Sequence, residues 1–144
     1  MAMTAEDIAA RLPELTGAPH DDAAITALAQ IIAEAIRALN PATFTHAGLD
    51  EPATVNAVLG QLATAAHRLP QLCGQLSGWL RQENTAGRLA HTTGSVEDLD
   101  GAAEDTLASL DRAARHATHL AEALDTAHRA TAWLYRPGDG GEDR

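Results

Sequence analysis

Apolar residues recur every three or four positions through two long stretches of this chain, residues 51–86 and 95–135. This spacing places them on one side of an α-helix, so each stretch is predicted to form a long amphipathic helix. The predicted packing stripe of the first consists of Val55, Val58, Leu62, Ala65, Leu69, Leu72, Leu76 and Trp79, widened at the adjacent position by Leu59, Ala66, Cys73 and Leu80. That of the second consists of Val96, Leu99, Ala103, Thr106, Leu110, Ala113, Ala117, Leu120, Leu124, Ala127, Thr131 and Leu134.

Capping and stop signals bound both helices. Asp50 is predicted to cap the first, with Pro52 in the first turn, where a missing N–H costs little. Ser95, followed by Asp98 three residues later, resembles a capping box that opens the second. The segment between them reads as a frayed end and a turn, and Pro137 with the glycines after it ends the second helix.

Two shorter helices are predicted before the long pair. The first spans about residues 5–15 and the second about residues 21–39. Asp21 or Asp22 is expected to cap the second, and the Asn-Pro pair ending at Pro41 is expected to stop it.

These elements predict an all-α fold, a helical bundle built on a long antiparallel helix hairpin with two shorter N-terminal helices. Residues 1–136 are expected to form a single helical domain, and residues 137–144 a disordered acidic tail. The only Phe, Phe44, is expected to plug one end of the core.

The lengths of the helices leave part of the hairpin uncovered. Each long helix would span on the order of 50 Å, whereas the helix at 21–39 would span about 28 Å. Another surface must then complete the bundle. A homodimer is the preferred solution, because symmetric self-association is common, and a different helical protein is the alternative.

The net charge is −10, and the ten Arg residues are scattered. This balance argues against a nucleic-acid partner, since neutralising phosphates requires clustered basic side chains. The densest acidic group, residues 96–105, is expected to be a solvated helix start, with docking of a basic partner as the alternative. No apolar run is long enough to suggest a membrane span, and the N-terminus does not read as a signal peptide. Together with a single cysteine, this predicts a soluble cytoplasmic protein.

No arrangement of residues predicts catalysis, so the chain is expected to be non-enzymatic and to need no cofactor. His116, His119 and Glu122 lie on successive turns and are the candidates for a metal site, but surface histidines are the preferred interpretation because no Glu-x-x-His pair occurs. Cys73, with no base nearby in the sequence, is interpreted as a small apolar residue.

The segment LPQLCGQLSGWL, residues 69–80, contains three residues that weaken helices. Pro70, Gly74 and Gly78 are predicted to point outward. One interpretation is a kink that curves the helix around the core. The other is a smooth strip where a second backbone approaches closely; the interface candidates are Gly74, Ser77, Gly78, Trp79 and Trp133.

The hairpin followed by WLYRPGD, in which Tyr135 and Asp139 satisfy Tyr-x-x-x-Asp, resembles the small helical-hairpin substrates of type VII secretion. The resemblance implies a secreted helical hairpin. This chain departs from that family, because Trp79 is followed by Leu80 and Arg81 where the family has Trp-x-Gly at the turn. Pro137 also interrupts the tyrosine motif, so the resemblance is carried only as an alternative.

The function predicted from the sequence is that of a helical interaction or scaffold protein, self-associating or a small subunit of a larger assembly. A metal- or small-ligand-binding bundle is the first alternative, and a type VII-like secreted hairpin is the second. A nucleic-acid regulator acting through the two N-terminal helices is disfavoured by the acidic balance.

Overall fold

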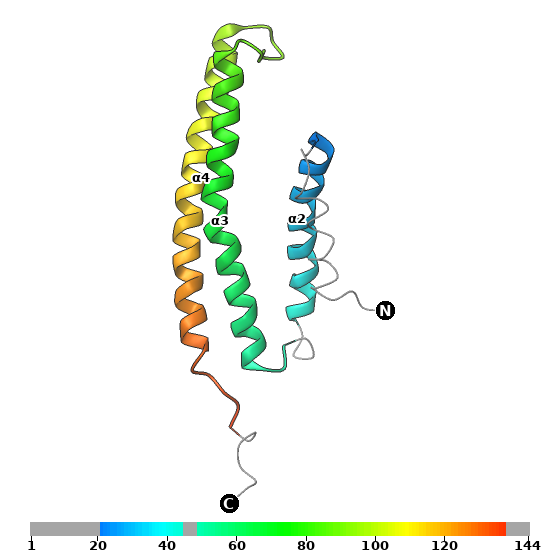
Figure 1. The fold of residues 1–144 in the computed structure, drawn as a ribbon, viewed down its shortest axis with the longest axis vertical. Coiled ribbons are helices and arrows are strands. Elements are labelled where there is room, and N and C mark those ends of the chain that lie inside the picture. Colours follow the sequence, from blue (N-terminus) through cyan, green and yellow to red (C-terminus); the bar gives the residue numbers. More distant parts are fainter. Residues whose placement is uncertain (1–20, 45–48, 138–144) are drawn as a thin grey trace, which may run out of the picture. The chain divides into compact units, whose positions relative to one another are not determined.

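The computed structural model describes residues 21–44 and 49–137, which form three helices, α2 (Asp22–Phe44), α3 (Pro52–Thr85) and α4 (Val96–Thr131) (Figure 1). These residues contain no strand, which confirms the all-α prediction for this part of the chain. The helix predicted at 5–15 and nearly all of the predicted tail lie outside the described residues. The chain divides into two compact units, residues 1–49 and 50–144, which are described separately. A single domain over 1–136 stays a prediction.

Helix α2 begins as predicted but ends later. Asp21 Oδ1 accepts a hydrogen bond from the backbone N–H of Ala24 at 2.8 Å, which confirms Asp21 as the cap. The helix then continues through Pro41 to Phe44, so the predicted stop is wrong. Pro41 removes only one N–H so close to the helix end, and the Thr43 hydroxyl lies 2.9 Å from the Leu39 carbonyl oxygen of the same turn.

Phe44 is the last residue of α2 rather than part of a loop. Its side chain is 88% exposed, so the prediction that it plugs the core is wrong.

Helices α3 and α4 run antiparallel, side by side, and form the predicted hairpin (Figure 1). Pro52 occupies the first turn of α3 as predicted, but the cap position belongs to Glu51, whose side chain makes no capping hydrogen bond. The prediction that Asp50 caps α3 is therefore wrong. Asp50 instead lies beyond the helix, with a carboxylate oxygen 3.6 Å from a guanidinium nitrogen of Arg136.

The predicted start of α4 is confirmed, and its predicted end is wrong. Ser95 Oγ accepts a hydrogen bond from the N–H of Asp98 at 3.2 Å, as expected of a capping box. The helix ends at Thr131, four residues before the predicted boundary. At its end the backbone tightens, because Trp133 N–H donates to the Ala130 carbonyl and Leu134 N–H to the Thr131 carbonyl, at 3.3 and 3.1 Å. Asn56 Nδ2 donates to the His128 carbonyl at 2.6 Å, which satisfies one of the last carbonyls of the helix.

The turn between the long helices is fixed by two glycines and an ion pair. Gly87 and Gly94 have φ of 67° and 75°, a left-handed conformation that side chains disfavour. Arg88 donates two hydrogen bonds to the Glu83 carboxylate, at 2.6 and 2.7 Å. These hydrogen bonds lower the pKa of Glu83 below its ordinary value and raise that of Arg88.

Small residues form the contact between α3 and α4. The buried residues of the hairpin are Ala63, Ala66 and Ser77 on α3 and Ala103, Ala117 and Ala121 on α4. On α3 they continue in steps of three or four through half-buried neighbours, and we call the whole stripe the seam: Leu59, Ala63, Ala66, Pro70, Cys73, Ser77 and Leu80. On α4 the seam consists of Leu99, Ala103, Leu107, Leu110, Ala114, Ala117, Ala121, Leu124 and His128.

The seam of α3 follows the row that was predicted only to widen the stripe, Leu59, Ala66, Cys73 and Leu80, and not the main row of the stripe. Leu69, Leu72, Leu76 and Trp79, expected in the packing stripe, are all exposed. One residue corresponds to a rotation of about 100° around the helix, so the adjacent positions meet α4 instead. Small side chains on both helices allow a close approach, which leaves the leucines beside the contact. On α4 the prediction holds for Leu99, Ala103, Leu110, Ala117 and Leu124. It fails for Thr106 and Ala113, which are exposed, and for Leu120, which is 50% exposed.

Candidate protein-binding surface

Five large apolar side chains of the hairpin lie beside the seam and are exposed. They are 37% to 59% exposed, and we call this surface the apolar face: Leu69, Leu72, Leu76 and Trp79 on α3 and Leu120 on α4. Each of Leu69, Leu72, Leu76 and Trp79 immediately precedes a seam residue of α3, and Leu120 immediately precedes Ala121 of the α4 seam.

The geometry of antiparallel helices brings these positions to one side of the hairpin. In two antiparallel right-handed helices that face each other, the residues one before the contact on each helix point to the same side, and the residues one after it point to the other. His67 follows Ala66, and Asp125 follows Leu124; His67 Nε2 and Asp125 Oδ2 meet at 2.7 Å. This pair bridges the helices on the second side, which places the leucines together on the first.

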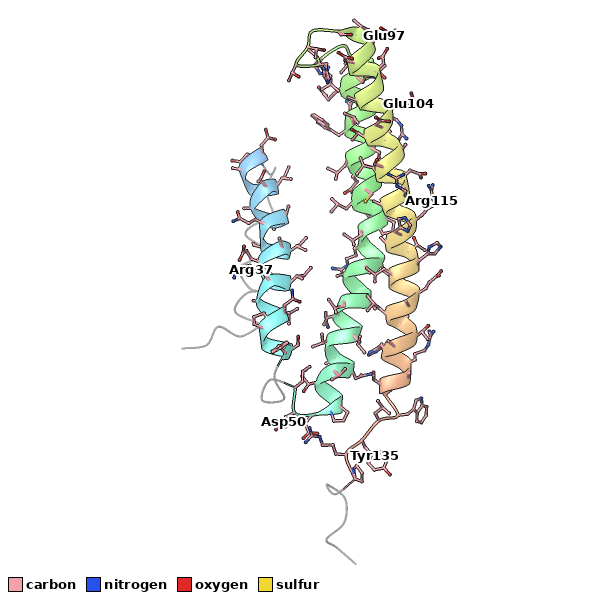
Figure 2. The ribbon with its side chains drawn as sticks, turned by 180° about the vertical axis from the view of Figure 1, so that it is seen from behind. Arg37, Asp50, Glu97, Glu104, Arg115 and Tyr135 are labelled. Carbon is pink, nitrogen blue, oxygen red and sulfur yellow. The ribbon has the colours of Figure 1, made fainter. Side chains whose placement is uncertain are left out.

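Charge separates the two sides. On the apolar side, the positions that precede the α3 seam from Val58 to Trp79 contain no Asp, Glu or Arg. The corresponding positions of α4 from Ala102 to Ala127 also contain no Asp, Glu or Arg: Ala102, Thr106, Ser109, Ala113, His116, Leu120, Ala123 and Ala127. The opposite side, which we call the polar face, carries Glu104, Asp111, Arg115, Glu122, Asp125 and Arg129 on α4. Figure 2 shows Glu104 and Arg115 on the side of α4 away from α3.

The structure separates the predicted interface candidates. Trp79 lies on the apolar face, and Trp133 follows α4 and is 86% exposed. Gly74 and Gly78 follow seam residues and so lie on the polar face, where a Cβ on either would meet no atom within 4 Å. Ser77 is only 6% exposed because it lies in the seam. These three therefore form no continuous exposed strip, although the role of each exposed candidate stays a prediction.

Pro70 does not point outward as predicted. It is half-buried and continues the seam between Ala66 and Cys73. Its ring supplies a compact apolar surface at a position where α4 lies close, which compensates in part for the missing N–H.

The open end of the hairpin contains a hydrogen-bonded cluster that the sequence did not reveal. His128 Nδ1 lies 2.8 Å from the Asn56 carbonyl oxygen, and Asn56 Nδ2 donates to Thr131 Oγ1 at 2.9 Å. The imidazole also covers Gly60, since a Cβ there would lie 3.0 Å from its Cε1. This cluster joins the start of α3 to the end of α4 and is a structural element of the hairpin.

The metal candidates are spread around α4, with His116 in the row that precedes the seam and Glu122 on the polar face. His116, His119 and Glu122 are all exposed on α4. Within residues 21–44 and 49–137, no group of three or more His, Cys, Asp or Glu side chains is arranged to hold a metal ion. Cys73 is half-buried in the seam and has a free thiol.

Comparison with known proteins gives no relative for this chain. No protein-family model, curated protein or solved structure matches it. None of the described helices is both long enough and apolar enough to cross a membrane.

Proposed function

We propose that this protein is a non-enzymatic helical interaction protein that self-associates through the apolar face of its hairpin. The observation that supports this proposal is the exposure of Leu69, Leu72, Leu76, Trp79 and Leu120 on one uncharged side. Fully burying one such side chain contributes roughly 1.5–3 kcal/mol, and about half of that remains to be gained here because each is 37% to 59% exposed. Contiguous exposed apolar patches of this kind mark protein-binding surfaces.

The large side chains of the apolar face occupy part of the hairpin. Leu69 to Trp79 span about 15 Å of α3 at about 1.5 Å per residue. A standard protein–protein interface buries about 800 Å² on each partner. The proposed contact therefore also has to include the uncharged small residues that continue this side of the hairpin toward Val58.

The test is the double substitution Leu69→Gln and Leu76→Gln, followed by light scattering over a range of concentrations. Both side chains are exposed beside the seam, so the hairpin is expected to keep its helical circular dichroism. Self-association is expected to weaken by at least about tenfold, the equivalent of about 1.4 kcal/mol. The matched control is Gln71→Ala with Gln75→Ala, two exposed positions of the same helix away from the apolar face.

One outcome would contradict the proposal. If the native chain is monomeric at every concentration and the leucine substitutions lower its melting temperature, then another part of the same chain covers the leucines. The apolar face would then be part of a core and not a binding surface.

A further inference from the structure

The exposed part of the apolar face is short, and both helices carry large side chains there. On α3 it covers residues 69–79, which span about 15 Å at about 1.5 Å per residue. His67 and Asp125 are level because their side chains meet at 2.7 Å. Leu72, five residues after His67, is therefore level with Leu120, five residues before Asp125. A single helix laid along the line between α3 and α4 would contact leucines of both helices at the centre of the face.

Length separates the possible occupants. The exposed stretch matches a helix of about three turns. Helix α2, with 23 residues, reaches about 35 Å and would extend far beyond the exposed side chains, and a second hairpin, with an α3 of 34 residues, is longer still. The predicted helix at residues 5–15, which lies outside the described residues, has the same number of residues as the stretch 69–79. Among the helices observed or predicted in this chain, it alone matches the face in length.

The sequence of residues 5–15, AEDIAARLPEL, also matches the face in pattern. Its apolar residues repeat the three-four-three spacing of the exposed row of α3: Ala5, Ile8, Leu12 and Leu15. This spacing sets them on one side of a helix. A helix of this length is marginal in water by itself, and Pro13 weakens it further, so the segment is expected to need an apolar surface on which to fold.

Two arginines lie at the outer edge of the apolar face. Arg68 is four residues before Leu72, so it lies beside the exposed row of α3. Arg112 has the same relation to His116 of α4, and its Nη2 donates to Ser109 Oγ at 3.3 Å. Within residues 21–44 and 49–137, neither guanidinium has a carboxylate at ion-pair distance. The edge of the face is therefore basic in a chain of net charge −10.

The segment 5–15 is complementary to this edge in charge. It carries three carboxylates, those of Glu6, Asp7 and Glu14, and one guanidinium, that of Arg11. The two edge arginines do not cancel the repulsion between whole copies of this acidic chain, but they lower it where the segment would lie.

We propose that residues 5–15 of a second copy cover the apolar face, and that two copies exchange these segments. This inference rests on the proposed function and names the part of the partner that the face binds. Residues 5–15 and the hairpin belong to different compact units of the chain, and exchange of an identical element between copies is a low-cost route to a dimer. Each copy then buries its segment as well as its face, which adds to the area that the face supplies.

The test is disulfide formation between two different variants of the full chain. One carries Leu12→Cys and the other Leu72→Cys, and Cys73→Ser removes the native thiol from both. A disulfide between the two variants joins different copies by construction. We expect this pair to form it at least about tenfold faster than the control pairs, because the contact raises the effective concentration of the two thiols.

The control pairs move one cysteine off the contact at a time. Ala10→Cys replaces Leu12→Cys on the opposite side of the predicted helix, and Gln71→Cys replaces Leu72→Cys at an exposed position away from the apolar face. Equal rates in all pairs, with a native chain that self-associates, would overturn the role of residues 5–15 and leave the proposed function standing. A native chain that is monomeric at every concentration would overturn the proposed function and this inference with it.

A second set of variants tests the contact without new cysteines. Ile8→Gln with Leu12→Gln is expected to weaken self-association by about tenfold or more, and Ala10→Gln to leave it unchanged. Combining Ile8→Gln and Leu12→Gln with the glutamine substitutions of the face should weaken it by less than the product of the two separate effects, because both sets remove the same contact. Independent effects would overturn the inference, since the segment would then act at another surface.

Discussion

Gly60 is a position of α3 where a single methyl group decides the fit of the hairpin. The His128 ring covers it, with Cε1, Nδ1 and Nε2 at 3.0, 3.2 and 3.4 Å from the place of a Cβ. The ring cannot move away freely, because its Nδ1 is 2.8 Å from the Asn56 carbonyl oxygen. Gly74 and Gly78 stand in contrast, with open space around both.

Alanine substitutions are therefore expected to act in opposite directions. Gly60→Ala should lower the melting temperature, since overpacking of this kind costs about 1–3 kcal/mol and exceeds the gain in helix propensity. Gly74→Ala with Gly78→Ala should raise the melting temperature, because each substitution adds up to about 1 kcal/mol to the free energy of unfolding. Thermal unfolding followed by circular dichroism measures both. A stabilising Gly60→Ala would show that His128 is not held against α3.

At the scale of the elements, the turn of the hairpin has an ion pair that depends on pH. The Glu83 side chain is only 18% exposed, and Arg88 donates two hydrogen bonds to it. The hydrogen bonds lower the pKa of Glu83 in the folded chain. A group with a lowered pKa stabilises the fold above its unfolded pKa and loses that contribution as the pH falls through the folded value.

Arg88→Gln is therefore expected to lower the melting temperature at neutral pH. The difference from the native chain should shrink as the pH falls below about 4.3, the ordinary pKa of Glu, and disappear below the lowered pKa of Glu83. Melting curves over a range of pH, with Glu83→Gln as the partner variant, measure this. A difference that stays constant at all pH values would assign the effect of Arg88 to packing.

The elements themselves could largely be predicted from the sequence, because their signals are local. Pro52 at the start of α3 and Ser95 at the start of α4 act through their immediate neighbours. The predicted end of α2 was wrong because Pro41 removes only one hydrogen bond near the end of the helix, which is too little to stop it. The predicted end of α4 was wrong because apolar periodicity continues to Leu134, whereas the backbone tightens after Thr131 and its last turn bonds to Asn56, far away in the sequence.

The face of α3 that meets α4 could not be predicted from periodicity alone. Two adjacent rows of apolar residues satisfy the same spacing, and size chooses between them: the small residues pair, and the leucines remain exposed. Trp79 was placed in the packing stripe and is exposed, and Ser77 was placed on an exposed strip and is buried in the seam. His128 and Gly60 were missed because their contact joins the two ends of the hairpin.

At the scale of the whole molecule, like charge opposes association. Each copy has a net charge of −10, while the proposed contact is apolar. Salt shortens the screening length from about 30 Å at 0.01 M to about 8 Å at 0.15 M. The repulsion between two acidic copies is then reduced, and the apolar contact is not weakened.

Self-association is therefore expected to tighten by a few fold between these two salt concentrations, as measured by sedimentation velocity. The double variant Leu69→Gln, Leu76→Gln should also associate more tightly at the higher salt concentration, because its net charge is unchanged. Its affinity at either concentration should be lower than that of the native chain. Dissociation on adding salt would instead indicate ion pairs across the interface, which the apolar face does not contain.

The seam of alanines has a consequence for how this protein tolerates mutation over evolutionary time. A larger side chain at Ala63, Ala66, Ala103, Ala117 or Ala121 would force the two helices apart, and selection would remove it through loss of the fold itself. A polar residue on the apolar face would leave the hairpin intact, and selection would remove it only through the loss of partner binding. Descendants that no longer need a partner should therefore keep their alanines and lose their leucines.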